Sequence, residues 1–116
     1  TGFQSLTGEL MRIDIQGEGG KTLQQHWANG PKTNLGVQFS GFPNLFAVMG
    51  PHNPGTFCNI TRCVESNTDW IVRCIRYVNE HGYKTIQATP EAEEAWTKRC
   101  HESVKGMLID EMRDSW

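Results

Sequence analysis

A short apolar run that leads into a Gly-Pro turn is the feature that most constrains the fold of this chain. Residues 45–49 are apolar throughout, as in a strand covered on both faces, and Gly50 and Pro51 follow directly. A long helical pattern begins at about Asn59. In open α/β sheets, ligands bind where the carboxyl end of a strand leads into a helix, and helix N-termini offer free N–H groups. We therefore expect a cofactor to lie beside residues 42–54.

Two further strands are predicted before this run. Residues 10–15 alternate apolar and polar side chains from Met11 onward, which predicts a half-buried strand that ends in the turn at residues 17–20. Residues 21–28 read as a short helical turn, and residues 35–39 read as another strand. The first part of the chain therefore predicts short strands and turns.

Two long helices are predicted in the second part. Apolar residues recur at close to helical spacing from residue 59 to residue 81, and Gly82 suits the C-terminal cap. A second helix has Thr89 as N-cap and Pro90 at its first position, and Gly106 is placed to end it. The apolar positions are Ile60, Val64, Trp70, Ile71, Cys74, Ile75 and Val78, then Ala92, Trp96, Cys100 and Val104. The resulting fold class is α/β, with short strands followed by two long C-terminal helices.

Composition excludes several classes of function. The 116 residues include 11 basic and 13 acidic side chains, for a net charge of -2 without a basic patch, which argues against nucleic-acid binding. The longest apolar run is far short of the ~20 residues that span a bilayer. The chain opens without an initiator Met or a signal peptide and ends at a bare Trp. We therefore expect a segment of a cytoplasmic polypeptide that binds neither nucleic acid nor membrane.

Residues that could act as metal ligands, nucleophiles or acid–base groups do not form a complete motif. The four cysteines lack zinc-site spacing, so we expect small buried apolar side chains in a reducing compartment, with a disulfide or a reactive thiol left open. The four histidines are scattered, which argues against a metal site, and only His52 falls beside the candidate ligand site. No nucleophile motif is present, and Glu93 and Glu94 are predicted to face solvent.

A series of short motifs runs in a characteristic order along all 116 residues. They are Thr1-Gly2-Phe3, Leu6-Thr7-Gly8, Ile13-Asp14-Ile15-Gln16-Gly17, Trp27 with Gly30-Pro31, Phe42-Pro43-Asn44-Leu45-Phe46, Gly50-Pro51, Glu65 with Trp70, Glu91-Ala92-Glu93-Glu94-Ala95-Trp96, and Ser115-Trp116. In this order they resemble the Baeyer–Villiger monooxygenases, although Gln4 replaces the Asp usual in the first motif.

The resemblance implies a flavoprotein with two dinucleotide-binding, Rossmann-like domains. Such an enzyme uses FAD, NADPH and O2 to insert one oxygen atom beside a ketone carbonyl, which gives an ester or a lactone. The chain resembles the C-terminal part of the FAD-binding region. Residues 1–41 would hold the end of an NADP-domain strand and a return excursion, residues 42–82 the last FAD-domain strand, the turn and the long helix, and residues 83–116 the second helix and a tail.

The resemblance also implies roles for individual residues. It places four residues near the flavin: Gly50, Pro51, Asn59 and Ile60. It places Thr1, Gly2 and Trp116 near NADP. It places Gly55, Thr56 and Phe57 in the substrate pocket. It implies no catalytic residue and no metal in this chain, because the Gly-rich loops and the catalytic Arg of the family would lie upstream. The chain alone is therefore expected to be inactive and to need the remainder of both domains.

Two other interpretations stay open at this point. One is a related flavin monooxygenase that oxidises nitrogen or sulfur instead of a ketone. The other is a non-catalytic α/β module that binds a partner protein. Bound flavin would separate the monooxygenases from the interaction module, since the cofactor carries the chemistry.

Overall fold

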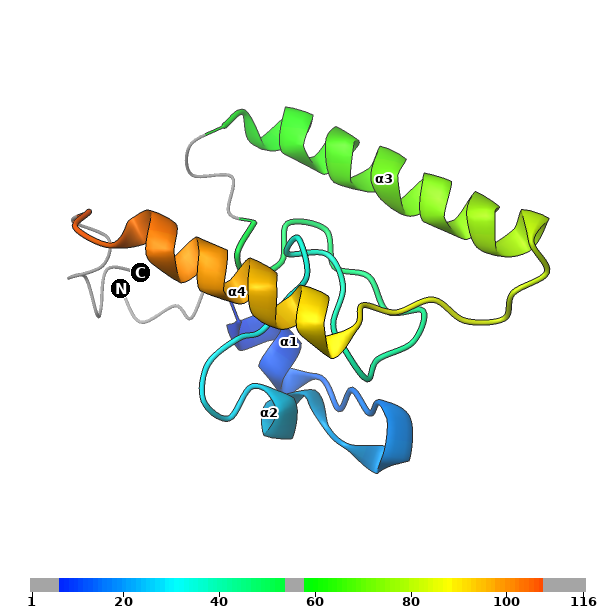
Figure 1. Ribbon diagram of the computed structural model, residues 1–116, viewed down its shortest axis with the longest axis horizontal. Helices are drawn as coiled ribbons and strands as arrows, with labels where there is room; N and C mark the ends of the chain where they lie inside the picture. The colour runs from blue at the N-terminus through cyan, green and yellow to red at the C-terminus, as the bar shows by residue number, and fades with distance from the viewer. Residues whose placement is uncertain (1–6, 54–57, 108–116) are drawn as a thin grey trace.

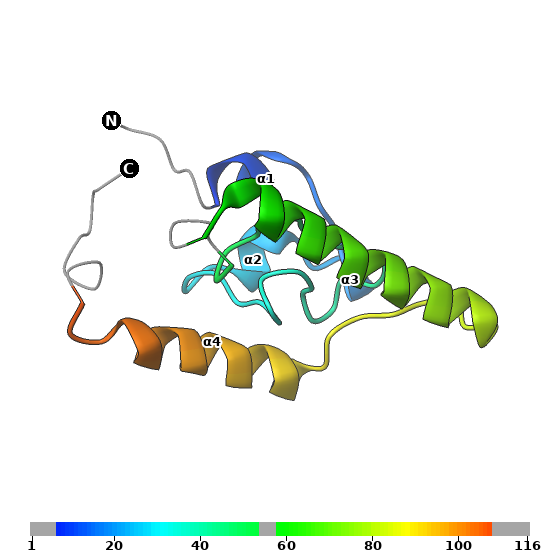
Figure 2. The same ribbon diagram turned by 90° about the horizontal axis from the view of Figure 1, so that it is seen from above.

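The computed structural model describes residues 7–53 and 58–107, which form helices joined by long irregular segments (Figure 1). The molecule measures 46 × 32 × 25 Å. In chain order, the helices are α1 (Gly8–Arg12), the 3-10 helix η1 (Glu18–Gly20), α2 (Leu23–His26), α3 (Ile60–Glu80) and α4 (Pro90–Val104). Seen from two directions, α3 and α4 lie on different sides of the irregular middle of the chain (Figures 1 and 2).

The predicted strands at residues 35–39 and 45–49 are wrong, since the described residues contain only isolated bridges, Gln16 with Thr22 and Asn34 with Gln38. Leu35 and Gly36 have positive φ angles and form a turn, and Asn44 and Met49 bend both ends of the apolar run. Within the run, the N–H of Leu45 donates to the Phe42 carbonyl (3.3 Å) and that of Ala47 to the Val37 carbonyl (2.8 Å), and just after the run the Gly50 N–H donates to the Gly36 carbonyl (3.1 Å). A strand needs a continuous ladder to a neighbouring strand, which these isolated bonds do not supply.

The predicted strand at residues 10–15 is also wrong, because residues 8–12 form α1. Leu10 and Met11 both pack against the core cluster, although neighbouring residues of a strand point to opposite faces. The side-chain amide of Gln24 donates to the carbonyl oxygens of Met11 (2.8 Å) and Ile13 (3.2 Å). These bonds satisfy carbonyls that the end of a helix leaves free. Contacts with α2 therefore override the local alternation.

The core lies in the first half of the chain. Leu23, Trp27, Phe39 and Phe42 form a buried cluster, in which the rings of Trp27 and Phe39 meet edge to face at 5.2 Å. The indole N–H of Trp27 donates to the Lys32 carbonyl at 3.0 Å. This cluster fixes the segment that leads into the apolar run and the Gly-Pro turn.

Both long helices are confirmed, together with the residues that begin them. Asn59 accepts a bond from the Arg62 N–H (3.3 Å) and Thr89 accepts one from the Ala92 N–H (3.2 Å), so each caps the N-terminus of its helix. Gly82 has a positive φ angle just after α3. None of the 21 residues of α3 is buried, and Ile60 is 63% exposed. Val64 and Ile75 are also exposed, so this part of the apolar stripe of α3 lacks a cover among the described residues, whereas Trp70, whose ring meets that of Phe46, is half-buried.

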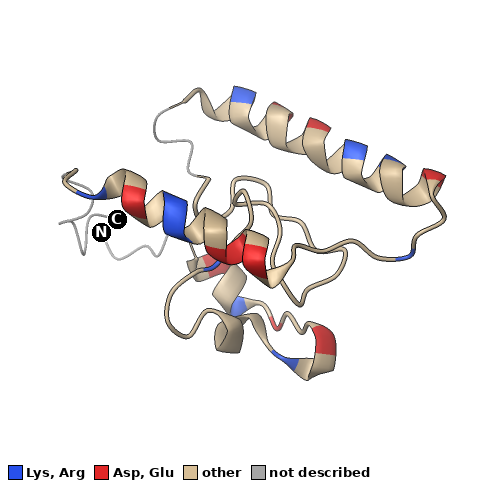
Figure 3. Cartoon of the chain, in the orientation of Figure 1, with Lys and Arg blue, Asp and Glu red and all other residues tan. Residues whose placement is uncertain are grey.

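Helix α4 begins with acidic residues, which Figure 3 shows in red, and one of them is buried. The prediction that Glu93 faces solvent is wrong, because its side chain is held inside by two partners. Its carboxylate lies 2.9 Å from Nε2 of His26 and accepts the backbone N–H of Ser40 at 2.7 Å. Glu93 therefore ties α4 to α2 and to the loop at Ser40, whereas Glu94 is exposed as predicted.

Candidate cofactor-binding site

The predicted junction is built around a tight turn at residues 50–53, in which the Asn53 N–H donates to the Gly50 carbonyl at 3.0 Å. The backbone of Gly50 packs directly on that of Gly36, and its N–H donates to the Gly36 carbonyl at 3.1 Å. A Cβ atom at position 50 would lie 2.6 Å from that carbonyl oxygen. Glycine at position 50 is therefore required by contact within the chain, whatever lies on the other side of the turn.

Thr33 is fully buried and stabilises the turn by hydrogen bonds. Its hydroxyl donates to the Pro51 carbonyl (3.2 Å) and accepts the N–H of Gly36 (3.2 Å). The backbone N–H of Thr33 donates to the hydroxyl of Thr97 on α4 at 3.2 Å. Through Thr33 the turn is therefore fixed to the same helix that Glu93 anchors.

His52, the histidine predicted beside the site, lies in this turn with a φ of 65°. Its Nδ1 is 3.2 Å from the Thr33 hydroxyl, and its ring is 5.6 Å from that of His101 on α4. Burial, and after it the positive charge of His101, lowers the pKa of His52 below its usual value. The turn therefore favours a neutral imidazole at this position.

The second wall of the junction is the start of α3. Asn59 caps it, Ile60 is exposed, and no hydrogen bond among the described residues uses the N–H groups of Ile60 and Thr61. Free N–H groups and the positive end of the helix dipole favour a ligand that carries negative charge or carbonyl oxygens. The described residues contain no group of three His, Cys, Asp or Glu side chains able to hold a metal ion.

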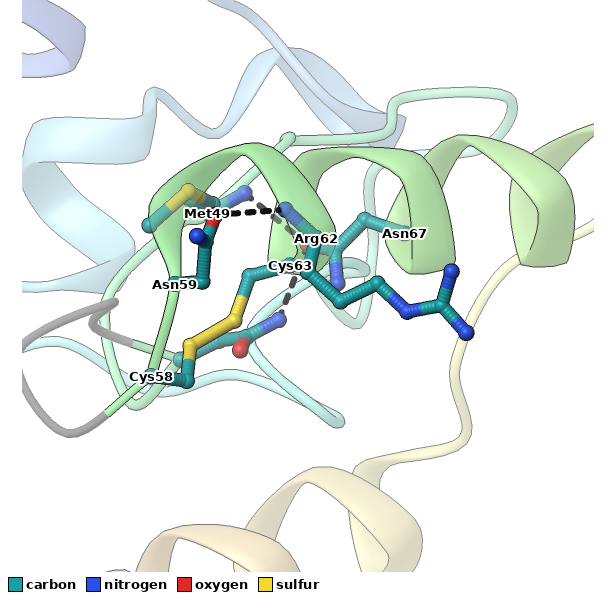
Figure 4. Close-up of a disulfide and its surroundings, with 7 residues drawn as sticks. Met49, Cys58, Asn59, Arg62, Cys63 and Asn67 are labelled. Atoms are coloured by element: carbon teal, nitrogen blue, oxygen red, sulfur yellow. Dashed lines mark hydrogen bonds between the residues drawn. A yellow bond between two sulfur atoms is a disulfide. The ribbon is translucent and has the colours of Figure 1, made fainter.

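A disulfide joins Cys58 and Cys63 across the first turn of α3 (Figure 4). These residues occupy the position before the N-cap and the fourth helical position, where an apolar pair commonly packs at a helix start. The expectation of small buried apolar side chains is therefore wrong for this pair, and Cys58 is exposed. Cys74 and Cys100 are free and half-buried.

The turn and the helix start are joined by a residue that sequence reasoning missed. Oδ1 of Asn67, on α3, accepts the N–H of Met49 at 3.0 Å (Figure 4), and it also accepts the side-chain amide of Asn53 at 2.9 Å. Asn67 falls on the apolar stripe of α3, between Val64 and Ile71. A lone polar residue on an otherwise apolar stripe was the signal that could have found it.

The structure brings part of the predicted site together. Gly50 and Pro51 are buried in the turn, and Asn59 and Ile60 lie at the start of α3. The remaining predicted residues are outside the described parts of the chain: Thr1, Gly2, Gly55, Thr56, Phe57 and Trp116. In those described parts, no helix is long and apolar enough to cross a membrane.

Comparison with known proteins gives matches over the whole chain. The 116 residues are 40% identical to 2-oxo-Delta(3)-4,5,5-trimethylcyclopentenylacetyl-CoA monooxygenase of Pseudomonas putida and 40% identical to a phenazine N-monooxygenase of Lysobacter antibioticus. They are 34% identical to a Baeyer–Villiger monooxygenase of Pseudooceanicola batsensis. Each match covers 100% of this chain and 21% of the relative. No protein-family model matches the chain.

Solved structures agree with these relatives. The complex of OTEMO with FAD and NADP superposes with a TM-score of 0.86 at 40% identity, over 93% of this chain and 20% of that chain. A cyclohexanone-bound cyclohexanone monooxygenase gives a TM-score of 0.83 at 39% identity, over 90% of this chain and 20% of that chain. The described helices and turns are therefore those of the matching part of flavin monooxygenases. The chain is homologous over its whole length to Baeyer–Villiger monooxygenases, and it spans about one fifth of the length of the relatives it matches.

Proposed function

We propose that this chain forms one wall of the FAD site of an NADPH-dependent Baeyer–Villiger monooxygenase. The enzyme would insert one atom of O2 beside a ketone carbonyl to give an ester or a lactone. The observation that carries the proposal is the match over all 116 residues to a Baeyer–Villiger monooxygenase. It is supported by the superposition on a structure that holds FAD and NADP.

The start of α3 fits the edge of a flavin ring. N–H groups at Ile60 and Thr61 are free of partners among the described residues, and the exposed side chain of Ile60 offers an apolar surface beside them. A flavin ring is flat and apolar, carries carbonyl oxygens at one edge, and gains negative charge when reduced. The N–H groups would hold that edge, and the helix dipole would favour the charge.

When bound, FAD would supply the reaction of oxygen with the ketone, while the protein binds, orients and excludes water. The Gly50-Pro51 turn would pack against the ring next to α3. From the family resemblance we assign Thr1, Gly2 and Trp116 to NADP, and Gly55, Thr56 and Phe57 to the substrate pocket. These six residues are proposals that rest on the resemblance alone.

The rest of the proposed protein would complete the site. The uncovered apolar stripe of α3 suits the remainder of the FAD-binding domain, because surfaces of this kind are normally buried. We keep the division into segments 1–41, 42–82 and 83–116 as part of this proposal. A Rossmann-like arrangement and a cytoplasmic location also stay proposals.

A second candidate is oxidation at nitrogen. It is favoured by one observation, the 40% identity to a phenazine N-monooxygenase over the same 116 residues. The chain does not separate the two reactions, because the proposed pocket residues are outside its described parts. The non-catalytic interaction module has no such relative in its favour.

The test is to purify the longest natural polypeptide that contains this chain and to measure bound flavin by its visible absorbance. NADPH oxidation is then followed with a panel of ketones and a panel of aromatic nitrogen heterocycles, and the products are identified by mass spectrometry. Esters or lactones confirm the proposal, and N-oxides support the second candidate. A folded, colourless protein that takes up no FAD contradicts both.

A further inference from the structure

Helix α3 carries one polar residue inside its apolar stripe. Successive members of the stripe are three or four residues apart, as on one face of a helix. They are Ile60, Val64, Asn67, Ile71, Cys74 and Val78. A polar side chain in such a stripe loses free energy on burial unless it is hydrogen-bonded, so the partners of the half-buried Asn67 define its role.

Those partners lie on both sides of the Gly-Pro turn. Oδ1 of Asn67 accepts the backbone N–H of Met49, just before Gly50, and the side-chain amide of Asn53, just after the turn (Figure 4). The backbone N–H of Met49 can only donate, so the amide orientation of Asn67 is fixed by its surroundings. One oxygen atom therefore holds the entry and the exit of the turn.

The bond to Met49 also stabilises an uncommon backbone conformation. Met49 has a φ of 54°, in the left-handed region that side chains other than Gly, Asn and Asp rarely adopt. Such residues persist where the surrounding structure over-determines them. Asn67 supplies part of that constraint from α3, and Gly36 supplies another part through the Gly50 N–H.

The same helix presents the proposed flavin contacts. Asn59, which caps α3, lies eight residues before Asn67, which is about 12 Å along the helix axis. An α-helix is stiff over this length, so a residue fixed at Asn67 fixes the direction of the helix start. Asn67 thus links the two elements of the candidate site, the turn and the N-terminus of α3.

We propose that Asn67 is a positioning residue for the flavin, which sets the Gly50-Pro51 turn against the start of α3 without touching the cofactor. This inference rests on the proposed function.

Three variants test it. Asn67→Leu removes both acceptor bonds at nearly constant volume, and it extends the apolar stripe. Asn67→Asp keeps an acceptor oxygen for both donors. Asn79→Leu is the matched control, because Asn79 lies on the same helix, is exposed, and makes no side-chain hydrogen bond in the described structure.

The test uses the full polypeptide and measures the dissociation constant for FAD, the shape of the flavin absorption bands at saturating FAD, and thermal stability. We expect Asn67→Leu to weaken FAD binding about tenfold, the equivalent of one to two lost hydrogen bonds, and to alter the bands. We expect Asn67→Asp to restore both within about threefold, which is less than 1 kcal/mol. Asn79→Leu should match the wild type.

The outcomes separate this inference from the proposed function. If the wild type takes up no FAD, the proposed function fails and this inference fails with it. If the wild type binds FAD and Asn67→Leu changes only the thermal stability, the inference alone is overturned. The same holds if Asn67→Asp behaves like Asn67→Leu. Should Asn67→Leu not fold, Asn53→Ala removes one of the two bonds, and unaltered flavin bands in that variant overturn the inference.

Discussion

The two long helices are attached to the rest of the chain in opposite ways. Helix α4 buries Glu93 and Thr97, and each of these makes hydrogen bonds to residues more than 50 positions away in the sequence. Helix α3 is longer and more regularly amphipathic, yet it buries no residue, and it is attached through the two bonds at Asn67 and the contact of Trp70 with Phe46. Helix α4 is therefore anchored by buried polar residues of this chain, whereas Ile60, Val64 and Ile75 of the α3 stripe are left exposed among the described residues.

The largest expected effect concerns the anchor of α4. Glu93→Ala leaves two groups, the Ser40 N–H and the His26 ring, without their shared partner, and each buried polar group left unsatisfied costs about 1–3 kcal/mol. We expect that loss in the free energy of unfolding of the full polypeptide, measured by denaturant titration. Glu94→Ala is the control, because this neighbour is exposed, and should change the free energy by less than about 0.5 kcal/mol. Equal effects of the two substitutions would show that the Glu93 network contributes nothing.

The second prediction tests whether α3 is covered in the full polypeptide. Ile75 is 46% exposed in this chain. If the proposed remainder of the FAD-binding domain packs on the stripe, Ile75→Ala in the full polypeptide should cost about 2–4 kcal/mol, as for a buried side chain. Arg76→Ala, next along the same helix and exposed, is the control. A cost below about 0.5 kcal/mol at Ile75 would mean that the stripe faces solvent.

The same reasoning predicts the behaviour of the isolated chain. Its uncovered stripe should make it associate, because exposed apolar patches of this kind promote contact between copies. Light scattering measures this directly, and a compact monomer at high concentration would contradict it. Ile75→Asp should reduce the association, since a charge in the patch must be desolvated on contact.

Some elements of the fold could be predicted from the sequence and others could not. Both helices were predicted, the first from about Asn59 with Gly82 as its C-terminal cap and the second with Thr89 as N-cap, because apolar spacing and caps act within a few residues of chain. The predicted strands were wrong, because a ladder depends on distant neighbours, and the single backbone bond that the run at residues 45–49 donates beyond its own turn goes to Val37. Local patterns therefore predict elements whose hydrogen bonds are local.

In the candidate site too, features that depend on neighbouring residues were predicted, and features that depend on distant residues were not. Gly50 and Pro51 were identified from the turn chemistry, and the structure adds that Gly50 faces Gly36, which no spacing rule connects to it. Glu93 was expected in solvent because acidic residues in the first turns of a helix usually are. Its burial depends on His26, 67 residues away in the sequence. Contacts between residues so far apart in the sequence depend on the fold, and the local spacing of residues does not predict them.

A third, smaller effect concerns the start of α3. The Cys58–Cys63 disulfide closes a short loop, with a sequence separation of 5, which by chain entropy is worth about 2 kcal/mol. We expect the double substitution to Ser, or a reducing agent, to lower the free energy of unfolding of the full polypeptide by about that amount. Cys74→Ser, on the same helix but outside the disulfide, is the control. No difference between oxidised and reduced protein would show that the bond does not stabilise this helix start.

The smallest expected effect is the pH dependence of the contact between the turn and α4. Burial and the neighbouring His101 lower the pKa of His52 in the folded state below its usual 6.5. The unfolded chain therefore binds more protons than the folded chain as the pH falls below 6.5, so this contribution to stability is complete above that pH and is lost in the acid range. His52→Asn should flatten that part of the profile, and Asn tolerates the left-handed backbone at this position. His101→Gln should remove the smaller, electrostatic part. A wild-type profile that stays flat within about one pH unit on either side of the ordinary histidine pKa would show that the turn does not disfavour the charged ring.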